Sequence, residues 1–497
     1  MYKLAELLEE IDYTSEKTIN NGIYVTDIIT NSREVTPKCL FICLKGCKND
    51  GHNYIKEAEK RGAEVIVCSE RCRYKTEKAL LVRVQSPRSV YGKIWRNAAG
   101  KPDKRLKIIA VTGTNGKTTV STMIYTALNA VGRKCALIGT LGGYFNGEKT
   151  SLDTMTTPDP EKLYPLMGRY ADNGAEYAVM EASSHALALG KLDGMDFFIG
   201  AVTNLTPEHL DFHGSMSEYC KAKSLLFPKC EKNIFCTDDS YVTEMYENAT
   251  GEKKSVSVKN KGADFFADDI AFNGINGVSF DFKFKGGSTH IKSDIPGEFT
   301  VSNALLSAAV LKELGLSLKE IAAGIHSLHG VKGRMEKLPT ASDFSVFIDF
   351  AHTPDALQKL ILTVNKFKKN GQRTVTLFGC GGDRDKSKRS LMGAIASRLS
   401  DFVIVTSDNS RSEKAEAIIN DIMTGFDKKC PHKVIADRKE AITFAVENAG
   451  KGDIILLCGK GHEEYEIDGS GARPFSEREI VYEALNNKKR KRDNEGI

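Results

Sequence analysis

Short apolar runs alternate with segments of helical spacing along most of the chain. Before residue 103 these runs fall at 23–30, 39–46, 63–69 and 79–84, with one helical segment near 53–61. Apolar runs of about four to eight residues are typical of buried strands. Alternation of such strands with helices predicts parallel sheets that are covered by helices on both faces.

The alternation occurs in two further sections. From Leu106 onward we expect strands at 106–113, 177–185 and 198–205, and helices at 117–132 and 296–315. The second section begins near Gly333, and its five apolar runs lie at 344–350, 373–380, 401–407, 432–436 and 453–459. The segment "AAGKPDKR" at 98–105 reads as a linker. We therefore predict an α/β protein of three domains, at residues 1–103, 104–332 and 333–497.

Composition adds a broad class. The chain is 41% hydrophobic and 27% charged, which is typical of a globular protein. It contains no uninterrupted apolar stretch of about 18 residues, so we expect no membrane span. The acidic, amphipathic start lacks the pattern of a secretion signal, so we expect the cytoplasm. The net charge of +5 arises from the basic run at 488–492, so a nucleic-acid-binding face is not indicated. We expect that run to be a frayed, solvated end, with contact to an acidic surface as the alternative.

A glycine-rich loop, "GTNGKTT" at 113–119, lies between a predicted strand and a predicted helix. Glycines let backbone N–H groups approach phosphate oxygens, Lys117 adds a charge, and the Thr118 hydroxyl can reach a magnesium ion. Only two residues separate Gly113 from the pair that Gly116 forms with Lys117, whereas the common loop has about four. A plain glycine turn is the alternative. The loop predicts nucleotide binding without separating a kinase, a switch ATPase and a ligase.

Polar residues also stand near the ends of other predicted strands. They are Glu181, His209, Asp211, Asp349 and His352. Ligands of open parallel sheets bind beyond the carboxyl ends of the strands, so Glu181 and Thr118 could share a magnesium ion. Each of these residues alone could equally be a helix cap or a satisfied buried group. Lys223 precedes the apolar "SLLF" and by itself reads as a lysine whose stem covers apolar surface.

Several motifs together resemble those of the Mur ligase family of cell-wall enzymes. They are "GTNGKTT", "EASSHAL", "NLTPEHLDFHGSMSEYCKAKSLLF", "GRME", "IDFAHTPDAL", "FGCGGDRDKSKR" and "GKGHEEY". The N-terminal "TNSREVTPKCLFICLKGCKNDGHNYI" is similar to the UDP-binding domain of that family. The resemblance runs from about residue 22 to 480. It implies a small α/β UDP-substrate domain, a central ATPase domain with a parallel sheet and a phosphate loop, and a C-terminal Rossmann-like domain for an amino acid.

The resemblance also implies roles for residues of this chain. ATP would be held by Gly113, Thr114, Asn115, Gly116, Lys117, Thr118, Thr119, Asn303, Asp349 and His352. The UDP-linked substrate would contact Ser32, Thr156, Thr157, Ser183 and Lys191. The incoming amino acid would contact Arg389, Asp408, Asn409, Ser410, Arg411, Gly459 and Glu463. Magnesium ions would be held by Thr118, Glu181, His209 and Lys223, the last as a carbamate derived from CO2. The catalytic residues would be Lys117, Glu181, His209 and Lys223.

The implied reaction is the formation of an amide at the expense of ATP. A carboxylate of UDP-N-acetylmuramoyl-L-alanyl-D-glutamate would take the γ-phosphoryl group, and the amine of meso-diaminopimelate would attack the resulting acyl phosphate. Lys117 and two magnesium ions would neutralise the converging negative charges. The resemblance further implies a monomer that supplies peptidoglycan precursors in the cytoplasm, and so serves cell shape and division.

The loop "TSDNSR" at 406–411 bears on which amino acid is used. Family members that use diaminopimelate typically have Asp-Asn-Pro-Arg here, and an arginine can grip the second carboxylate. Arg411 therefore favours diaminopimelate, although Ser410 replaces the proline. Lys191 and Thr300 also differ from the residues frequent in the family. The alternatives are the same reaction with L-lysine or another diamino acid, a kinase or switch ATPase, and a non-catalytic nucleotide-binding protein on this scaffold.

Overall fold

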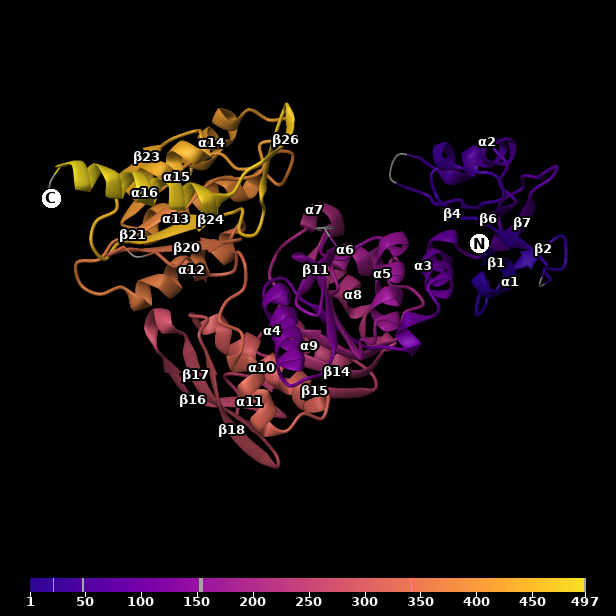
Figure 1. Ribbon diagram of the computed structural model, residues 1–497, viewed down its shortest axis with the longest axis horizontal. Helices are drawn as coiled ribbons and strands as arrows, with labels where there is room; N and C mark the ends of the chain where they lie inside the picture. Colours follow the sequence, from indigo (N-terminus) through magenta and orange to yellow (C-terminus); the bar gives the residue numbers. More distant parts are fainter. Residues whose placement is uncertain (21, 47–48, 152–154, 341, 496–497) are drawn as a thin grey trace. The chain divides into compact units, whose positions relative to one another are not determined.

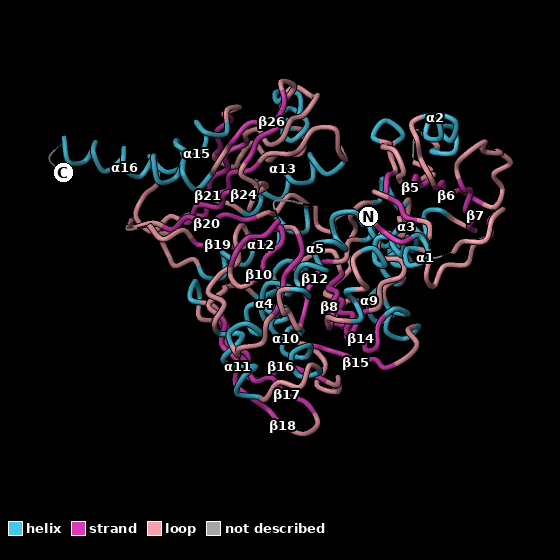
Figure 2. Tube along the Cα trace, turned by 45° about the vertical axis from the view of Figure 1, so that its right-hand side comes forward, coloured by secondary structure: helices cyan, strands magenta, loops and turns pink. Residues whose placement is uncertain are grey.

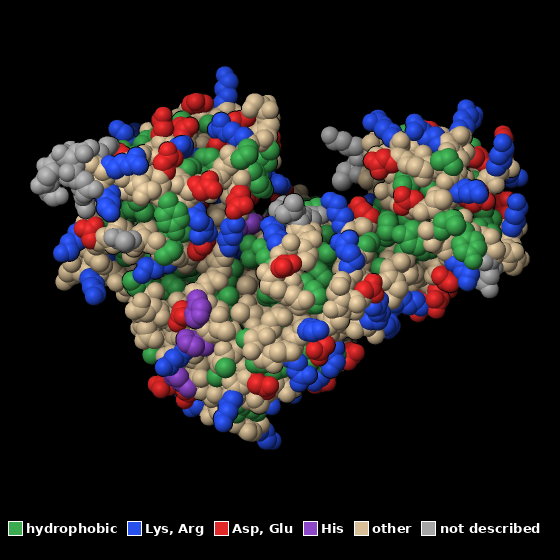
Figure 3. Space-filling model, in the orientation of Figure 1, with side chains coloured by type: hydrophobic (Ala, Val, Ile, Leu, Met, Phe, Trp, Pro, Cys, Tyr) green, Lys and Arg blue, Asp and Glu red, His purple; other side chains and the backbone are tan. Residues whose placement is uncertain are grey.

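The computed structural model describes residues 1–20, 22–46, 49–151, 155–340 and 342–495, with side chains up to residue 490. The chain forms two compact units, and their helices and strands are drawn in Figures 1 and 2. The first unit comprises residues 1–113, 128–203 and 215–255, and the second comprises 114–127, 204–214 and 256–497. On the face drawn in Figure 3, basic and acidic side chains are interspersed. None of the helices in this described part is both long and apolar enough to cross a membrane.

The N-terminal sheet has the strand order β2-β7-β6-β5-β4. Its strands are β2 (Thr14–Ser15), β4 (Ile28–Ile29), β5 (Leu40–Ile42), β6 (Val65–Ser69) and β7 (Leu80–Val84). Strands β4 to β7 pair in parallel, as the four apolar runs predicted, although the run at 23–30 is divided between β4 and the short β3 (Tyr24–Val25). Helix α2 (Ile55–Lys60) occupies the predicted helical segment, and α3 (Pro87–Ala98) follows the sheet.

The segment predicted as a linker is packed rather than loose. Asp103 lies in the 3-10 helix η3 (Pro102–Lys104) and is buried. Arg96 of α3 is also buried, and it donates from Nε to Asp103 Oδ1 at 2.8 Å and from Nη2 to Oδ2 at 2.9 Å. Two parallel charge-assisted hydrogen bonds compensate the desolvation of both groups. The segment between α3 and β8 (Lys107–Thr112) therefore connects two parts of the chain, as predicted, but it is held by a buried ion pair.

The first unit also contains part of an 11-stranded sheet, with the strand order β11-β10-β9-β12-β8-β13-β14 in that part. Its strands are β8 (Lys107–Thr112), β9 (Cys135–Gly139), β10 (Gly142–Phe145), β11 (Glu148–Ser151), β12 (Tyr177–Glu181), β13 (Phe197–Val202) and β14 (Cys230–Cys236). Strands β9, β12, β8, β13 and β14 are parallel. Strands β8, β12 and β13 confirm the three predicted strands, whereas β9 and β14 were not predicted. The carboxyl ends of β8 and β12 therefore share one edge, where Gly113 and Glu181 stand. Besides α2 and α3, this unit contains the helices α5 (Pro160–Asp172), α6 (Ser184–Ala188), α8 (Met216–Ser224) and α9 (Ser240–Asn248).

The second unit contains antiparallel strands that we did not predict. They are β16 (Phe265–Phe272), β17 (Val278–Phe284) and β18 (Gly287–Ser293). Strand β17 alternates apolar and polar residues, and polar residues also interrupt β16 and β18, so the three strands lack the continuous apolar runs that marked the other strands. Helix α10 (Glu298–Glu313) contacts β16 and β17 and lies within the predicted helix at 296–315. Helix α11 (Leu318–His326) contacts β18.

The C-terminal sheet has the order β19-β20-β24-β21-β22-β23. All five predicted runs are strands: β20 (Ser345–Asp349), β21 (Thr374–Phe378), β22 (Phe402–Val405), β23 (His432–Val434) and β24 (Ile454–Cys458), and they pair in parallel. One core cluster packs α12 (Pro354–Phe367), α13 (Ser387–Leu399) and α14 (Ala415–Met423) on one face. A second cluster packs α15 (Arg438–Glu447) and α16 (Glu477–Glu495) on the other face (Figure 1).

The basic run near the C-terminus begins as part of a packed helix. Lys488 of α16 donates hydrogen bonds to Val446 O at 3.0 Å and Ala449 O at 2.7 Å. Its Nζ also lies 4.8 Å from the centroid of the Phe344 ring. The prediction of a frayed, solvated end was therefore wrong at Lys488, because carbonyl groups at the end of α15 attract the ammonium group.

Candidate functional site

The glycine-rich loop has the backbone that anion binding requires. Gly113 has φ 135° and Gly116 has φ 88°, in the left-handed region that only glycine adopts at little cost. Helix α4 (Lys117–Ala130) begins directly after Gly116. Lys117 Nζ donates to Thr114 O at 2.8 Å, so the ammonium group lies back over the loop. The loop thus combines glycines whose backbone can direct N–H groups toward an anion, the N-terminus of a helix, and the ammonium group of Lys117.

A second loop, at residues 204–206, holds the glycine-rich loop in place. Thr114 Oγ1 donates to Thr206 O at 3.1 Å and accepts from Thr206 N at 3.0 Å. Asn115 N donates to Asn204 Oδ1 at 3.1 Å, and Asn204 Nδ2 donates back to Asn115 O at 3.0 Å. Sequence reasoning did not select Asn204 or Thr206, although both stand at the polar end of a predicted strand.

The residues predicted around the nucleotide come together with two that were missed. Asn303 of α10 is buried beside Gly116. Thr118 Oγ1 accepts a hydrogen bond from Arg334 Nη2 at 3.2 Å, and Asn115 Nδ2 donates to Asp355 Oδ2 at 3.2 Å. Arg334 and Asp355 belong to the quoted motifs "GRME" and "IDFAHTPDAL", but no spacing rule singles them out.

Asp349 fixes the turn that carries Arg334. Its carboxylate accepts from Met335 N at 2.6 Å and from Ala351 N at 2.8 Å. Burial raises the pKa of Asp349, while the nearby guanidinium of Arg334 lowers it. Arg334 in turn stacks on Phe350, with its Cζ 4.6 Å from the ring centroid. Asp349 therefore organises the Arg334 turn.

His209 and His352 face the same carboxylate. Glu208 Oε2 lies 3.8 Å from His209 Nε2, and Glu208 Oε1 lies 3.7 Å from His352 Nε2. Burial and then the neighbouring charge of Lys388 lower the pKa of His352, whereas Glu208 raises it. His209 precedes α7 (Leu210–His213) with φ 56°. Glu208 was not selected from the sequence.

Glu181 lies at the centre of a cluster of hydroxyl groups. It is buried at the end of β12, where its Oε1 accepts from Thr140 N at 2.9 Å and its Oε2 accepts from Thr140 Oγ1 at 3.0 Å. Thr157 Oγ1 donates to Glu181 O at 2.9 Å and accepts from Ser183 N at 2.9 Å. Thr156 Oγ1 lies 3.2 Å from Thr140 Oγ1. Three predicted substrate residues, Thr156, Thr157 and Ser183, are therefore connected to Glu181.

The two remaining residues predicted for the UDP-linked substrate stand elsewhere. Lys191 forms an ion pair with Asp159, with Nζ 2.7 Å from Oδ1. Ser32 is buried in the 3-10 helix η1 (Ser32–Glu34) of the N-terminal domain. The five residues predicted to contact the UDP-linked substrate thus lie on different elements of the first unit, as contact with an extended ligand would require.

Lys223 is buried in α8, with a relative exposure of 1%. Its Nζ donates to Gly113 O at 2.8 Å and lies 4.7 Å from the centroid of the Tyr219 ring. A carbonyl oxygen and an aromatic face both stabilise a cation. The interpretation of Lys223 as a surface lysine is therefore wrong, and its side chain is directed at the start of the glycine-rich loop.

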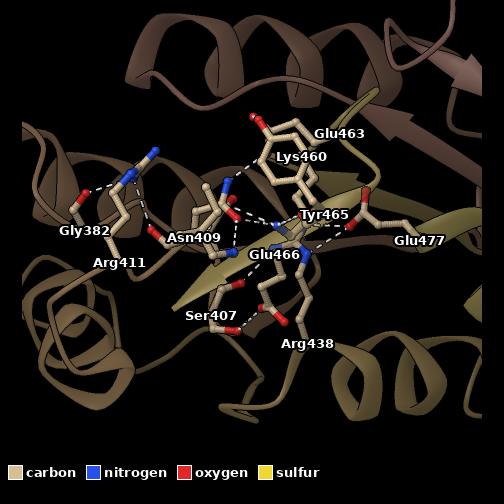
Figure 4. Close-up of polar contacts among 12 residues, drawn as sticks. Gly382, Ser407, Asn409, Arg411, Arg438, Lys460, Glu463, Tyr465, Glu466 and Glu477 are labelled. Carbon is tan, nitrogen blue, oxygen red and sulfur yellow. Dashed lines mark hydrogen bonds and ion pairs between the residues drawn. The ribbon is translucent and has the colours of Figure 1, made fainter. Parts of the chain in front are cut away.

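The loop after β22 and the loop after β24 meet in the C-terminal domain (Figure 4). Asn409 Nδ2 donates to Glu463 Oε2 at 2.8 Å. Gly459 has φ 115°, and a Cβ there would lie 2.5 Å from Asp408 Oδ2. Arg411 Nη1 donates to Gly382 O at 2.8 Å and to Asn409 O at 3.2 Å. Ser410 is buried in the same loop. Six of the seven residues predicted for the amino-acid site therefore lie next to one another: Asp408, Asn409, Ser410, Arg411, Gly459 and Glu463.

Arg389 is held by two carboxylates. It is fully buried, and its guanidinium group contacts Glu413 Oε1 at 2.8 Å and Asp421 Oδ2 at 2.8 Å. The hydrogen bond to Arg389 is the largest cause that lowers the pKa of Glu413 to about 2. Arg389 Nη2 also donates to Gly381 O at 3.3 Å, next to the Gly382 that Arg411 contacts. The contribution of Arg389 to amino-acid binding stays a prediction.

Two buried cations beneath these loops were missed. Lys460 is fully buried and donates to Asn409 Oδ1 at 2.9 Å. Arg438 donates to Ser407 O at 2.9 Å, to Cys458 O at 2.7 Å and to Glu477 Oε1 at 2.8 Å. Lys460 was visible in "GKGHEEY", whereas nothing in its local sequence separates Arg438 from a surface arginine. Among the described residues, no group of three or more His, Cys, Asp or Glu side chains is arranged to hold a metal ion.

Comparisons with known proteins cover nearly the whole chain. Three family models match: "Mur ligase family, catalytic domain" at 24–99, "Mur ligase middle domain" at 111–311 and "Mur ligase, glutamate ligase domain" at 333–461. The chain is 41% identical over 485 residues to the UDP-N-acetylmuramoyl-L-alanyl-D-glutamate--2,6-diaminopimelate ligase of Caldanaerobacter subterraneus, covering 97% of this chain and 99% of that one. It is 40% identical over 488 residues to the ligase of that name from Clostridioides difficile, again covering 97% and 99%.

Solved structures agree on the fold. A structure of a ligase with the same name has 29% sequence identity and a TM-score of 0.68, and the match covers 98% of this chain and 99% of that chain. The MurF ligase of Thermotoga maritima in complex with ADP has 18% identity and a TM-score of 0.61, covering 95% and 100%. The first match extends over all three predicted domains, and the second supports the fold alone.

Proposed function

Because the chain belongs to the Mur ligase family, we propose that it is the ATP-dependent ligase that adds meso-diaminopimelate to UDP-N-acetylmuramoyl-L-alanyl-D-glutamate. The products would be the lengthened UDP-peptide, ADP and phosphate, and the step would supply cytoplasmic peptidoglycan synthesis. The observation that carries the proposal is the full-length similarity to ligases named for this reaction. Arg411, which stands in the loop after β22, supports the choice of amino acid.

We assign ATP to residues 113–119 together with Asn303, Asp349 and His352. The positive φ angles of Gly113 and Gly116 allow successive N–H groups to converge on phosphate oxygens. Lys117 would leave its contact with Thr114 O and place its charge on the terminal phosphates. The contact of Asn303 with the edge of the loop supports its place beside the nucleotide.

Magnesium and the carbamate belong to the same proposal, and the donor chemistry fits. The Thr118 hydroxyl and the Glu181 carboxylate offer the hard oxygen atoms that magnesium prefers, and His209 would assist. Bound magnesium would neutralise charge on the triphosphate and on the carboxylate that receives the phosphoryl group. Burial of Lys223 beside Gly113 supports a role for its terminal group at the phosphates, which as a carbamate would be an anionic oxygen donor.

The acceptor substrate would lie along Ser32, Thr156, Thr157, Ser183 and Lys191. Lys191 places an ammonium group beside Asp159, and such a cation is suited to an acidic group of the UDP-linked peptide. The hydroxyl groups that surround Glu181 offer donors and acceptors for the peptide and the sugar.

The amino acid would be bound by groups of opposite charge. Arg411 offers a guanidinium group to a carboxylate, and Glu463 offers a carboxylate to an ammonium group. Burial and the neighbouring Asp408 raise the pKa of Glu463, while Asn409 and Lys460 lower it. A second carboxylate on the side chain distinguishes diaminopimelate from lysine, and an arginine can bind it through two parallel hydrogen bonds.

A panel of amino acids with purified protein tests the proposal. The assay contains ATP, magnesium and the UDP-linked dipeptide, and it measures phosphate release and the mass of the UDP-peptide. We expect an increase in mass equal to one diaminopimelate residue, with little product from L-lysine. More product from L-lysine than from diaminopimelate would show that L-lysine is the substrate. Ser410, which stands where the family typically has proline, makes this comparison important. Nucleotide hydrolysis without any lengthened peptide would overturn the reaction itself.

A further inference from the structure

We infer that Lys460 is a positioning residue, which holds Asn409 so that Arg411 and Glu463 present opposite charges at fixed places for the incoming amino acid. The inference rests on the proposed function, since it concerns the amino-acid site of that reaction. The side chain of Lys460 is completely buried from solvent, with a relative exposure of 0%.

Lys460 makes three polar contacts and one aromatic contact, and Figure 4 shows those with Asn409 and Tyr465. Its Nζ donates to Asn409 Oδ1 at 2.9 Å and to Tyr465 O at 3.0 Å, and it lies 4.0 Å from Asp408 Oδ1. The centroid of the Phe475 ring is 5.4 Å away. An isolated buried ammonium group is costly, so a lysine here requires these partners. In return, the partners are held by a charged donor, which makes stronger hydrogen bonds than a neutral one.

The contact with Asn409 decides which way its amide points. Asn409 Oδ1 accepts from Lys460 Nζ and also from Ile467 N at 3.0 Å. With the oxygen fixed by two donors, Nδ2 is directed to Glu463 Oε2 at 2.8 Å. If the amide turned over, its NH2 group would face two donors and its oxygen would face a carboxylate. Lys460 therefore selects the orientation that holds Glu463.

The same asparagine also reaches Arg411. Arg411 Nη1 donates to the backbone carbonyl oxygen of Asn409 at 3.2 Å and to Gly382 O at 2.8 Å. Arg411 itself adopts φ 53°, so its backbone depends on the surrounding loop. One buried cation is thus connected through one asparagine to an arginine and a glutamate. A free amino acid carries a carboxylate and an ammonium group, and these two side chains complement them.

The test compares Lys460→Met with Lys488→Met. Lys488 resembles Lys460 in that its Nζ donates to two carbonyl oxygen atoms, here of the backbone, and lies near an aromatic ring, but it is not part of the site. We expect Lys460→Met to raise the KM for diaminopimelate about tenfold or more, as for loss of a buried charge-assisted hydrogen bond. The KM for ATP should stay within about twofold, and Lys488→Met should leave both constants unchanged.

A crystal structure of Lys460→Met tests the positioning independently of turnover. We expect the Asn409–Glu463 hydrogen bond to be lost and the Arg411 guanidinium group to move. An unchanged Asn409 with an unchanged KM for diaminopimelate would overturn the inference, as would an equal rise in both KM values. Lys460→Gln, which keeps a neutral N–H donor, replaces the methionine variant if that protein does not fold.

The wild-type reaction separates this inference from the proposed function. If wild-type protein joins no diamino acid to the UDP-dipeptide, the proposed function fails, and the variant's crystal structure still decides whether Lys460 positions Asn409. If wild-type protein is active and Lys460→Met keeps its KM for diaminopimelate, the inference alone fails.

Discussion

Gly116 and Asn303 are in contact across the edge of the phosphate loop: a Cβ added to Gly116 would lie 2.5 Å from Asn303 Oδ1. Asn303 is buried in α10 with a relative exposure of 6%, so its amide has little space into which to withdraw. Gly116 also has φ 88°, which side chains adopt only with strain. Both the space and the backbone therefore require glycine here.

We predict that Gly116→Ala raises the KM for ATP by about tenfold or more, since about 1.4 kcal/mol of strain and displacement is enough. The KM for diaminopimelate should change little. Gly132→Ala is the control, because Gly132 has φ 80° but no atom within 4 Å of the added Cβ. Steady-state kinetics of both variants would separate the contact with Asn303 from the backbone strain. Equal ATP constants in the two variants would argue against a role for the contact.

Arg411→Ala should affect the amino acid far more than the nucleotide. Hydrogen bonds to charged groups contribute about 1.5–3 kcal/mol, so we expect the KM for diaminopimelate to rise about 10- to 100-fold. Activity with L-lysine, which lacks the second carboxylate, should fall much less. The control is Arg398→Ala, since Arg398 is an exposed arginine of α13 that donates to Ala394 O. A similar loss with both amino acids would show that Arg411 does not read the second carboxylate.

The ion pair of Arg438 and Glu477 should contribute strongly to stability. Both side chains are buried, and the guanidinium group also caps Ser407 O and Cys458 O. Arg438→Met leaves Glu477 without its cation, so we expect a loss of about 3–5 kcal/mol in the free energy of unfolding. Denaturant titration followed by circular dichroism measures the change.

Lys439 and Glu483 provide a matched control for that measurement. They join the same two helices, α15 and α16, with Nζ 3.1 Å from Oε2, but both side chains are more than half exposed. Lys439→Met should cost about 1 kcal/mol or less, because exposed ion pairs are solvated in either state. If the two variants lost the same stability, burial would not be the reason for the effect at Arg438.

Continuous apolar runs predicted the parallel strands well, and alternating strands were overlooked. Strands such as β24 (Ile454–Cys458) are buried on both faces, so their sequence is apolar at every position. Strand β17 (Val278–Phe284) alternates apolar and polar residues, so it has no continuous apolar run. The packing of the linker at 98–105 could not be predicted, because Asp103 looks like a surface residue until its partner Arg96 is known.

Candidate residues were predicted where a motif has its own chemistry. The glycine loop and Glu181 follow from their position after strands, and Lys223 was reached only through the family resemblance. Lys460, Arg334 and Glu208 contact other protein groups that lie up to 216 residues away in the chain. Their local sequence contains no sign of those partners, so only the folded structure identifies them.

Lys223→Ala should abolish turnover, because it removes the buried ammonium group that donates to Gly113 O, and the proposed carbamate would be lost as well. Lys221→Ala is the matched control: Lys221 lies two residues earlier on α8, is 70% exposed, and pairs with Glu218. It should retain wild-type activity.

Small carboxylic acids separate the two explanations for a loss at Lys223. Removal of the side chain leaves a cavity beside Gly113 that an acetate-sized acid can enter. If a carbamate supplies an anionic oxygen at the phosphates, such acids should restore part of the phosphate release in Lys223→Ala, with a dependence on acid concentration that Lys221→Ala does not share. If Lys223 acts instead as a cation, small amines should restore activity and acids should not. Full activity of the unsupplemented Lys223→Ala variant would remove Lys223 from the reaction altogether.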